Sequence, residues 1–190
     1  MTLICGIVLA AGAGSRFGGP KALARTPVGE PWIARAVATL RGGGCDEVLV
    51  ALGAGRAEAA PLVPPGAVAV EVPQWVSGVS ASIRAALATA SAGAATAALI
   101  VPVDTPTMPA AVVTRLAAVA GGDALARAVY AGAPGHPVLI GRKWWDAVAA
   151  AVTGDRGAGP YLAAHAATRI ECGDLWDGAD IDRSLAPALA

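Results

Sequence analysis

The sequence has few cysteines, few aromatic residues and little charge, and each shortage excludes a class of protein. Its 190 residues include 3 cysteines, 4% aromatic residues and 15% charged residues. Cys5, Cys45 and Cys172 lie far apart and form no C-x-x-C pair, which argues against a disulfide framework. An odd, dispersed set of cysteines is typical of free thiols in a reducing cytosol. We therefore expect a cytoplasmic protein.

The chain also lacks long apolar runs and an excess of either charge. No stretch approaches the ~20 uninterrupted apolar residues that span a bilayer. Its 14 basic residues balance its 14 acidic ones, which argues against binding to nucleic acid or to an anionic membrane. The first apolar run has no basic residue before it, since Arg16 is the first positive charge, so no signal peptide is expected.

What the chain does have is small apolar side chains, arranged in short runs. Hydrophobic residues make up 55% of the sequence, which excludes intrinsic disorder. At ~150 residues per domain, residues 1–190 form a single domain. Apolar runs predict strands at 3–9, 48–52, 68–72, 97–103, 127–131, 137–140 and 168–172. Helical spacing predicts helices at 31–40, 80–90, 109–120, 143–152 and 160–167.

This alternation of strands and helices predicts a three-layer α/β domain with a mostly parallel sheet. The strands 127–131 and 137–140 are expected to be joined by a Gly/Pro loop. Ser77, Ser80 and Ser82 are expected in the N-terminal turn of the helix 80–90, where serine is a common capping residue.

A glycine-rich segment follows the first predicted strand and carries two cations. Residues 9–21 read LAAGAGSRFGGPK, and their glycines leave backbone N–H groups open to an anion. Arg16 and Lys21 add the positive charge that a triphosphate requires. The alternative is a surface turn with solvated cations. Because the chain has two lysines against twelve arginines, a lysine at this place favours anion binding.

Two better-known glycine motifs do not fit this segment. The P-loop pattern G-x-x-x-x-G-K-S/T fails because Pro20 stands where its lysine belongs. The dinucleotide pattern G-x-G-x-x-G fails because Phe17 stands at the sixth place counted from Gly12.

A second candidate site follows the predicted strand 97–103. Asp104, in the run VDTP, is a hard-oxygen ligand suited to Mg²⁺. The alternative is that Asp104 caps the helix after Pro109 or closes a turn with Thr105 and Pro106. The glycine-rich loop favours the metal, because ligands of open α/β sheets bind beyond the carboxyl ends of the strands.

Four segments in this order resemble a known enzyme family. The loop 9–21 is similar to the signature loop of sugar- and cofactor-type nucleotidyltransferases. The segments QWVSGVSASI (74–83), DTP (104–106) and GHPVL (135–139) resemble the molybdopterin nucleotidyltransferases, particularly the molybdenum cofactor cytidylyltransferases. The resemblance extends from Leu9 to about Asp182.

The resemblance implies a Rossmann-like fold of the nucleotide-diphospho-sugar transferase type. It implies transfer of a nucleoside monophosphate from an NTP to a terminal phosphate of a molybdopterin-type cofactor, with release of pyrophosphate. Arg16 and Lys21 would hold the triphosphate, and Asp104 would bind Mg²⁺ and complete the catalytic set. The implied substrate-binding residues are Leu9, Ala10, Ala11, Gly12, Gly14, Ser77, Gly78, Ser80 and His136.

CTP is the expected nucleotide, because Ala10 and Ala11 stand where guanylyl members tend to carry a second glycine. His136 would face the acceptor; alternatively it orients its loop by hydrogen bonds. The expected partners are the NTP, a phosphate-bearing small-molecule acceptor and, transiently, a molybdoenzyme or chaperone. Trp75 is the one tryptophan placed to stack on a substrate.

Two segments depart from the family pattern. Residues 154–159, GDRGAG, end in Gly159 where the family commonly has arginine, although Arg156 is a possible substitute. Residues 180–184, DIDRS, keep the two acids and replace a Thr-Pro turn by Arg183 and Ser184.

The metal is expected to be shared by two acids. Asp104 and Asp182, with Asp180 as the substitute for Asp182, would converge on one edge of the nucleotide pocket, where only a cation offsets their repulsion. The alternative is that Asp182 caps a helix over 184–189.

Two other functions stay open. One is a cytidylyl- or uridylyltransferase that acts on a sugar or polyol phosphate. The other is a nucleotide-binding module that has lost catalysis.

Overall fold

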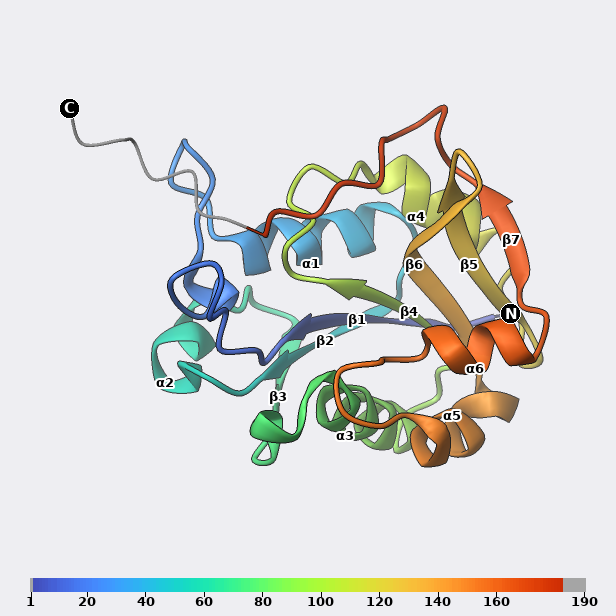
Figure 1. The fold of residues 1–190 in the computed structure, drawn as a ribbon, viewed down its shortest axis with the longest axis horizontal. Helices are drawn as coiled ribbons and strands as arrows, with labels where there is room; N and C mark the ends of the chain where they lie inside the picture. The colour runs from blue at the N-terminus through green and yellow to red at the C-terminus, as the bar shows by residue number, and fades with distance from the viewer. Residues whose placement is uncertain (1, 183–190) are drawn as a thin grey trace.

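The first strand of the chain, β1, lies inside a seven-stranded sheet, next to the central strand β4 (Figure 1). The computed structural model describes residues 2–182. The strands are β1 (Ile4–Ala10), β2 (Glu47–Leu52), β3 (Ala67–Glu71), β4 (Ala97–Pro102), β5 (Leu125–Tyr130), β6 (Ala133–Gly141) and β7 (Thr168–Glu171), in the spatial order β3-β2-β1-β4-β6-β5-β7. All seven strands expected from apolar runs are present.

The pairing within the sheet is mostly parallel, as predicted. Strand β1 runs parallel to β2 and β4, β2 to β3, and β5 to β7. Strand β6 is antiparallel to both of its neighbours, β4 and β5. The carboxyl ends of β1 and β4 therefore meet the beginning of β6 at one edge of the sheet.

Helices cover both faces of the sheet. They are α1 (Trp32–Gly42), α2 (Arg56–Ala59), α3 (Val79–Ser91), α4 (Ala110–Ala117), α5 (Trp145–Ala151) and α6 (Gly159–Ala164). Figure 1 shows α1 and α4 on one face and α3, α5 and α6 on the other. The apolar residues of α1 recur at helical spacing, so Ile33, Val37 and Leu40 pack on Val8 and Val50 of the sheet. The opposite core is built from Ile7, Ile100, Leu87 and Trp145, among others.

The connection between β5 and β6 corrects a sequence expectation. Instead of a Gly/Pro loop, a two-residue turn of Ala131 and Gly132 joins the strands, with φ of 48° and 79°. Positive φ at both positions matches the right-handed twist of a hairpin. Pro134 and Pro137 lie within β6, where the register with β5 shifts and the ladder is irregular. Prolines are tolerated at such a bulge because fewer N–H donors are needed there.

The N-terminus of α3 also differs from the expected serine cap. Gly78 is the N-cap residue, and no side chain caps it locally. The N–H of Val79 donates instead to Oδ1 of Asp155, 3.3 Å away and 76 residues further along the chain. The loop 154–155 therefore takes the place of a local cap and is fixed against α3.

Two further expectations concern cysteine and membranes. Cys5, Cys45 and Cys172 are buried free thiols, as predicted. Burial raises the pKa of the Cys45 thiol to about 12, so this thiol stays protonated at neutral pH. Within residues 2–182, no helix is both long enough and apolar enough to cross a membrane. The expected helix over 184–189, together with Arg183 and Ser184, lies outside the described residues.

Candidate active site

A cavity of about 850 Å³ opens at the carboxyl ends of β1 and β4. This is the edge at which open α/β sheets bind their ligands. The glycine-rich loop, the beginnings of α3 and α6, strand β6 and the last described residues all contribute to its wall. The expected residues on this wall are Leu9, Ala10, Ala11, Gly12, Gly14, Arg16, Lys21, Gly78, Asp104, His136 and Asp182.

The glycine-rich loop owes its shape to Gly14. Its φ is +61°, and a Cβ at this position would lie 1.9 Å from the carbonyl oxygen of Gly19. The Gly14 carbonyl accepts the N–H groups of Phe17, Gly18 and Gly19 at 2.9 to 3.1 Å, which closes the loop on itself. Gly12 has no such steric reason, because a Cβ there would meet nothing within 4 Å. Its place on the cavity wall fits close approach by a ligand.

Lys21 joins two distant acids at the cavity edge. Its Nζ lies 2.7 Å from Oδ2 of Asp104 and 3.1 Å from Oδ1 of Asp182. The side chains of Lys21 and Asp104 are 15% and 17% exposed, against 50% for Asp182. Arg16 is 83% exposed and reaches Asp182 at 3.8 Å. Both cations predicted from the loop therefore lie at the acids predicted from two other segments.

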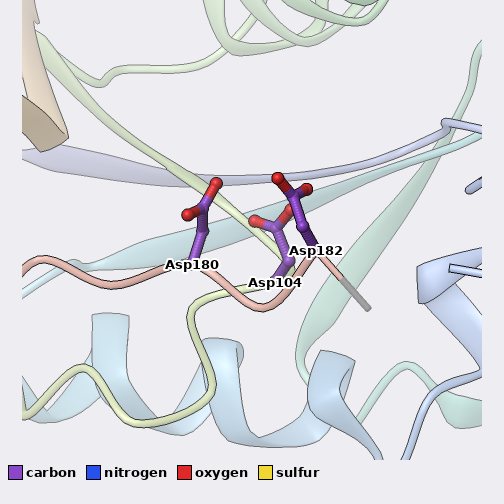
Figure 2. Close-up of side chains that lie close together, drawn as sticks. All are labelled: Asp104, Asp180 and Asp182. Atoms are coloured by element: carbon purple, nitrogen blue, oxygen red, sulfur yellow. The ribbon is translucent and has the colours of Figure 1, made fainter. Parts of the chain in front are cut away.

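A third acid completes this group. Oxygen atoms of Asp104, Asp180 and Asp182 all lie within 4.8 Å of one another. Figure 2 shows the three carboxylates reaching the same side of two neighbouring segments. The N–H of Ile181 donates to the Asp104 carbonyl at 2.9 Å, which aligns the two segments. Because side chains alternate along an extended chain, Asp180 and Asp182 face the cavity while Ile181 packs against the core.

The electrostatics of the group favour a cation. Burial lowers the pKa of the Lys21 ammonium, but hydrogen bonds and charges from Asp104 and Asp182 outweigh burial and raise the pKa above its ordinary value. Oδ1 of Asp104 is buried and has no hydrogen-bond partner within residues 2–182. A buried carboxylate oxygen without a partner is costly, so the donor set fits a divalent cation. Asp104 does not cap α4, whose N-cap is Pro109.

The serines predicted at the site lie in different places. Ser77 and Ser80 are not among the cavity-lining residues, whereas Ser82 is. Ser80 is fully buried, and its hydroxyl accepts a hydrogen bond from Arg84 at 3.1 Å. Gly78 does line the cavity, with φ of +92°, and a Cβ there would lie 2.5 Å from Gly154. Gly78 is thus needed for the close approach of the loop 154–155.

His136 lies half-buried on the cavity wall, in the first half of β6. Burial lowers its pKa to about 4, although the charge of Asp104 opposes this shift. Its imidazole is therefore neutral at pH 7. The His136 carbonyl accepts a 2.6 Å hydrogen bond from the Tyr130 hydroxyl, which fixes the backbone at this point.

Sequence reasoning missed part of the cavity. Arg127 of β5 lies on its wall, together with Asp155 and the apolar residues Ile83, Val138 and Leu162. An arginine within the apolar strand LARAVY was the available signal for Arg127. Trp75, Arg156 and Gly159 also line the cavity, and a Cβ on Gly159 would meet nothing within 4 Å.

The chain is similar to known proteins over almost its whole length. The profile of the MobA-like NTP transferase domain matches residues 6–169. Nicotine blue oxidoreductase of Paenarthrobacter nicotinovorans is 33% identical over 191 residues, which cover 94% of this chain and 92% of that protein.

Solved structures also superpose on most of the chain. Rv0371c of Mycobacterium tuberculosis H37Rv superposes with a TM-score of 0.75 at 27% identity, over 96% of this chain and 94% of that one. A structure of Rv0371c in complex with manganese gives a TM-score of 0.70 at 25% identity, over 90% and 89% of the two chains. A nucleotidyl transferase from Methanothermobacter shares the fold, with a TM-score of 0.76 at 21% identity over 96% and 93%.

Proposed function

From the premise that the chain belongs to the family of the MobA-like NTP transferase domain, we propose that it transfers CMP from CTP to a terminal phosphate of a molybdopterin-type cofactor. Pyrophosphate is the second product. The observation that carries the proposal is the meeting of Lys21, Asp104 and Asp182 beside a glycine-rich loop in one cavity.

The glycine-rich loop is suited to binding the nucleotide. The backbone N–H groups of Ala13, Ser15 and Arg16 donate to no other group within residues 2–182, so they are available to an anion. Arg16 and Lys21 add the charge that offsets a triphosphate. Ala10 and Ala11 line the cavity, and their small side chains would lie beside the base of CTP.

Asp104, Asp180 and Asp182 suit a divalent cation, which we assign as Mg²⁺. The manganese complex of Rv0371c supports a divalent metal in this family. When bound, such an ion neutralises the negative charge of the phosphates between which the nucleotidyl group passes. Asp104 would hold the ion through its otherwise unpartnered Oδ1, and the exposed Asp180 and Asp182 would each offer one further carboxylate oxygen.

The protein's own residues act by position and charge. An oxygen of the acceptor phosphate attacks the α-phosphorus of CTP, the bond from this phosphorus to the oxygen that bridges to the β-phosphorus breaks, and pyrophosphate leaves with that oxygen. The attacking oxygen is already anionic at neutral pH, so no side chain has to remove a proton. Lys21 remains protonated because of its two carboxylate partners and stabilises the departing charge. Neutral His136 is available to donate a hydrogen bond to the acceptor.

The acceptor and the cellular setting are part of the same proposal. His136 and Arg156 lie on the cavity wall and would face the acceptor. The buried free thiols support a cytoplasmic setting. Delivery of the product would bring transient contact with a molybdoenzyme or its chaperone.

Three other functions compete with this one. Gly159 lines the cavity at the position where the family commonly has a positively charged arginine. Without this charge, the acceptor would be a sugar or polyol phosphate, or the chain would bind a nucleotide without catalysis. The third alternative is redox chemistry, because the relative that is 33% identical is an oxidoreductase by name.

An assay of pyrophosphate release separates all of these functions. CTP, GTP, UTP and ATP are each offered with molybdopterin or a sugar phosphate, and oxidation of NADH and NADPH is followed in parallel. The proposal expects CTP- and molybdopterin-dependent release. Release with a sugar phosphate alone favours the sugar-phosphate enzyme, and nucleotide binding without release favours the inactive module. Oxidation of NADH or NADPH without release favours the redox function.

A further inference from the structure

Arg127 is a charged residue in the middle of an otherwise apolar strand. In β5 it stands opposite Val138 of β6 and Arg169 of β7. Its side chain lines the cavity together with the apolar Val138 and Leu162. Arg127 is half-buried, and the buried part of its guanidinium needs an acceptor, because burial of a polar group is costly unless the group is hydrogen-bonded.

No such partner exists in the part of the chain that the structure describes. Nε of Arg127 is buried without a hydrogen-bond acceptor. No ion pair or hydrogen bond joins its guanidinium to any of residues 2–182, whereas Arg84, Arg142 and Arg169 each donate to backbone carbonyls. Arg127 therefore differs from these three arginines, whose guanidinium groups are satisfied by the backbone.

The electrostatic setting of Arg127 points to an anion. Burial, and then the neighbouring charge of Arg169, lower the pKa of Arg127. The guanidinium nevertheless stays charged at neutral pH because its ordinary pKa is so high. An anionic group in the cavity would supply the missing acceptors, and a planar guanidinium binds phosphate or carboxylate oxygens in pairs.

Arg127 lies across the cavity from the nucleotide loop. That loop follows β1, while Arg127 belongs to β5, and β4 and β6 separate the two strands. Three strand spacings of ~4.8 Å amount to about 14 Å. His136 belongs to β6, which lies between β4 and the strand of Arg127. The triphosphate at Lys21 and Arg16 is therefore not the natural partner of Arg127.

We propose that the Arg127 guanidinium binds an acidic group of the acceptor and so selects acceptors that carry an oxyanion at this end of the cavity. The inference rests on the proposed function only in identifying the anion as part of the acceptor. The anion site itself is argued from the surroundings of Arg127. Gly159 begins α6, whose Leu162 lines the cavity together with Arg127, so Arg127 supplies a cation on the side of the cavity where Gly159 lacks one.

The test uses inorganic phosphate as the probe. The protein is first saturated with Mg²⁺ and a non-hydrolysable CTP analogue, which fills the nucleotide half of the cavity. Phosphate is then titrated while the Nε–H signal of Arg127 is followed by nitrogen-15 NMR, the signal being identified by its loss in Arg127→Gln. Arg56→Gln is the control, because Arg56 is exposed, pairs with Glu71 and does not line the cavity.

The expected result is a saturable shift of this signal in the wild type. Phosphate should also raise the melting temperature of the wild type and of Arg56→Gln, with a dissociation constant at least tenfold lower than in Arg127→Gln. Arg127→Met replaces Arg127→Gln if the latter does not fold. Equal phosphate binding by the wild type and either Arg127 variant overturns the proposal.

Competition between phosphate and the CTP analogue at Arg127 also overturns the proposal, since the Arg127 guanidinium would then bind the nucleotide and not the acceptor. If the analogue itself does not bind, the proposed function fails. The phosphate titration of the free protein then still decides whether Arg127 holds an anion.

Discussion

Nζ of Lys21 lies 2.7 Å from Oδ2 of Asp104, although 83 residues separate the two in the sequence. This ion pair connects the glycine-rich loop after β1 with the carboxyl end of β4. It is largely shielded from water, since both side chains are less than one-fifth exposed. The pair therefore fixes the loop and also places a positive charge where the triphosphate is expected.

Replacement of Lys21 should remove this charge without unfolding the chain. We expect Lys21→Ala to lower kcat/KM for the NTP at least tenfold, a loss above ~1.4 kcal/mol in transition-state stabilisation. Lys143 is the natural control, because it is the other lysine of the chain and is exposed just before α5. Wild-type kinetics in a folded Lys21→Ala variant would show that the loop is only a turn.

The two glycines of the loop should respond differently to alanine. Gly14→Ala places a side chain at positive φ and against the Gly19 carbonyl, so it should cost about 1–3 kcal/mol in the free energy of unfolding. Gly12→Ala meets no neighbour and should leave the melting temperature unchanged while KM for the NTP rises severalfold. An unchanged KM in Gly12→Ala would mean that the nucleotide does not approach this residue.

The acidic group should set the metal requirement. We expect Asp104→Asn to raise the Mg²⁺ concentration needed for half-maximal activity at least tenfold, and Asp182→Asn to raise it less, because Asp182 is more exposed. Direct binding of Mn²⁺, followed by electron paramagnetic resonance, checks this without turnover.

Asp123→Asn is the control for the metal experiment, since Asp123 is exposed and lies outside the cavity. An unchanged metal requirement in Asp104→Asn contradicts the whole site assignment. The same outcome in Asp182→Asn removes only that ligand.

His136 should make stability depend on pH. Its pKa is about 4 in the folded protein against 6.5 in the unfolded chain, so between these values only the unfolded chain binds the proton. Stability should thus fall as pH decreases from 6.5 to 4 and should not fall further on this account below pH 4. One unit of pKa shift is worth about 1.4 kcal/mol, and we expect at least that loss by pH 4.5.

Urea denaturation at pH 7 and pH 4.5 measures this loss. His136→Gln should lose less stability than the wild type over this interval, whereas His165→Gln, which alters the other, exposed histidine, should match the wild type. Identical losses in all three proteins would place His136 in water rather than in a buried setting.

Much of the fold could be predicted because the strands are short, continuous apolar runs. Residues 3–9 and 97–103 are buried on both faces, so their pattern is unambiguous. The hairpin at Ala131 and Gly132 could not be located, because Pro134 and Pro137 indicate a loop and only the irregular ladder accommodates them in a strand. Strand order was also out of reach, since the antiparallel insertion of β6 depends on pairing between distant segments.

The candidate site, like the fold, could be predicted only in part. Lys21 and Asp104 could be found because each follows a buried strand at the ligand-binding edge of the sheet. The hydrogen bond from Arg84 to the Val152 carbonyl could not be found, since it depends on how α3 packs against the segment that follows α5. Arg127 was visible only as a charge in an apolar strand, and nothing local shows which face of the sheet it occupies.

The most direct test of the central claim follows the two ends of the nucleotide. The protein is incubated with Mg²⁺, molybdopterin and CTP that is labelled either at the α-phosphate or at the γ-phosphate, and parallel reactions contain labelled GTP. The proposed reaction predicts the α label in the cofactor product and the γ label in pyrophosphate, with a higher kcat/KM for CTP than for GTP. A γ label recovered as orthophosphate, or no transfer of the α label to any phosphate-bearing acceptor, would contradict the account.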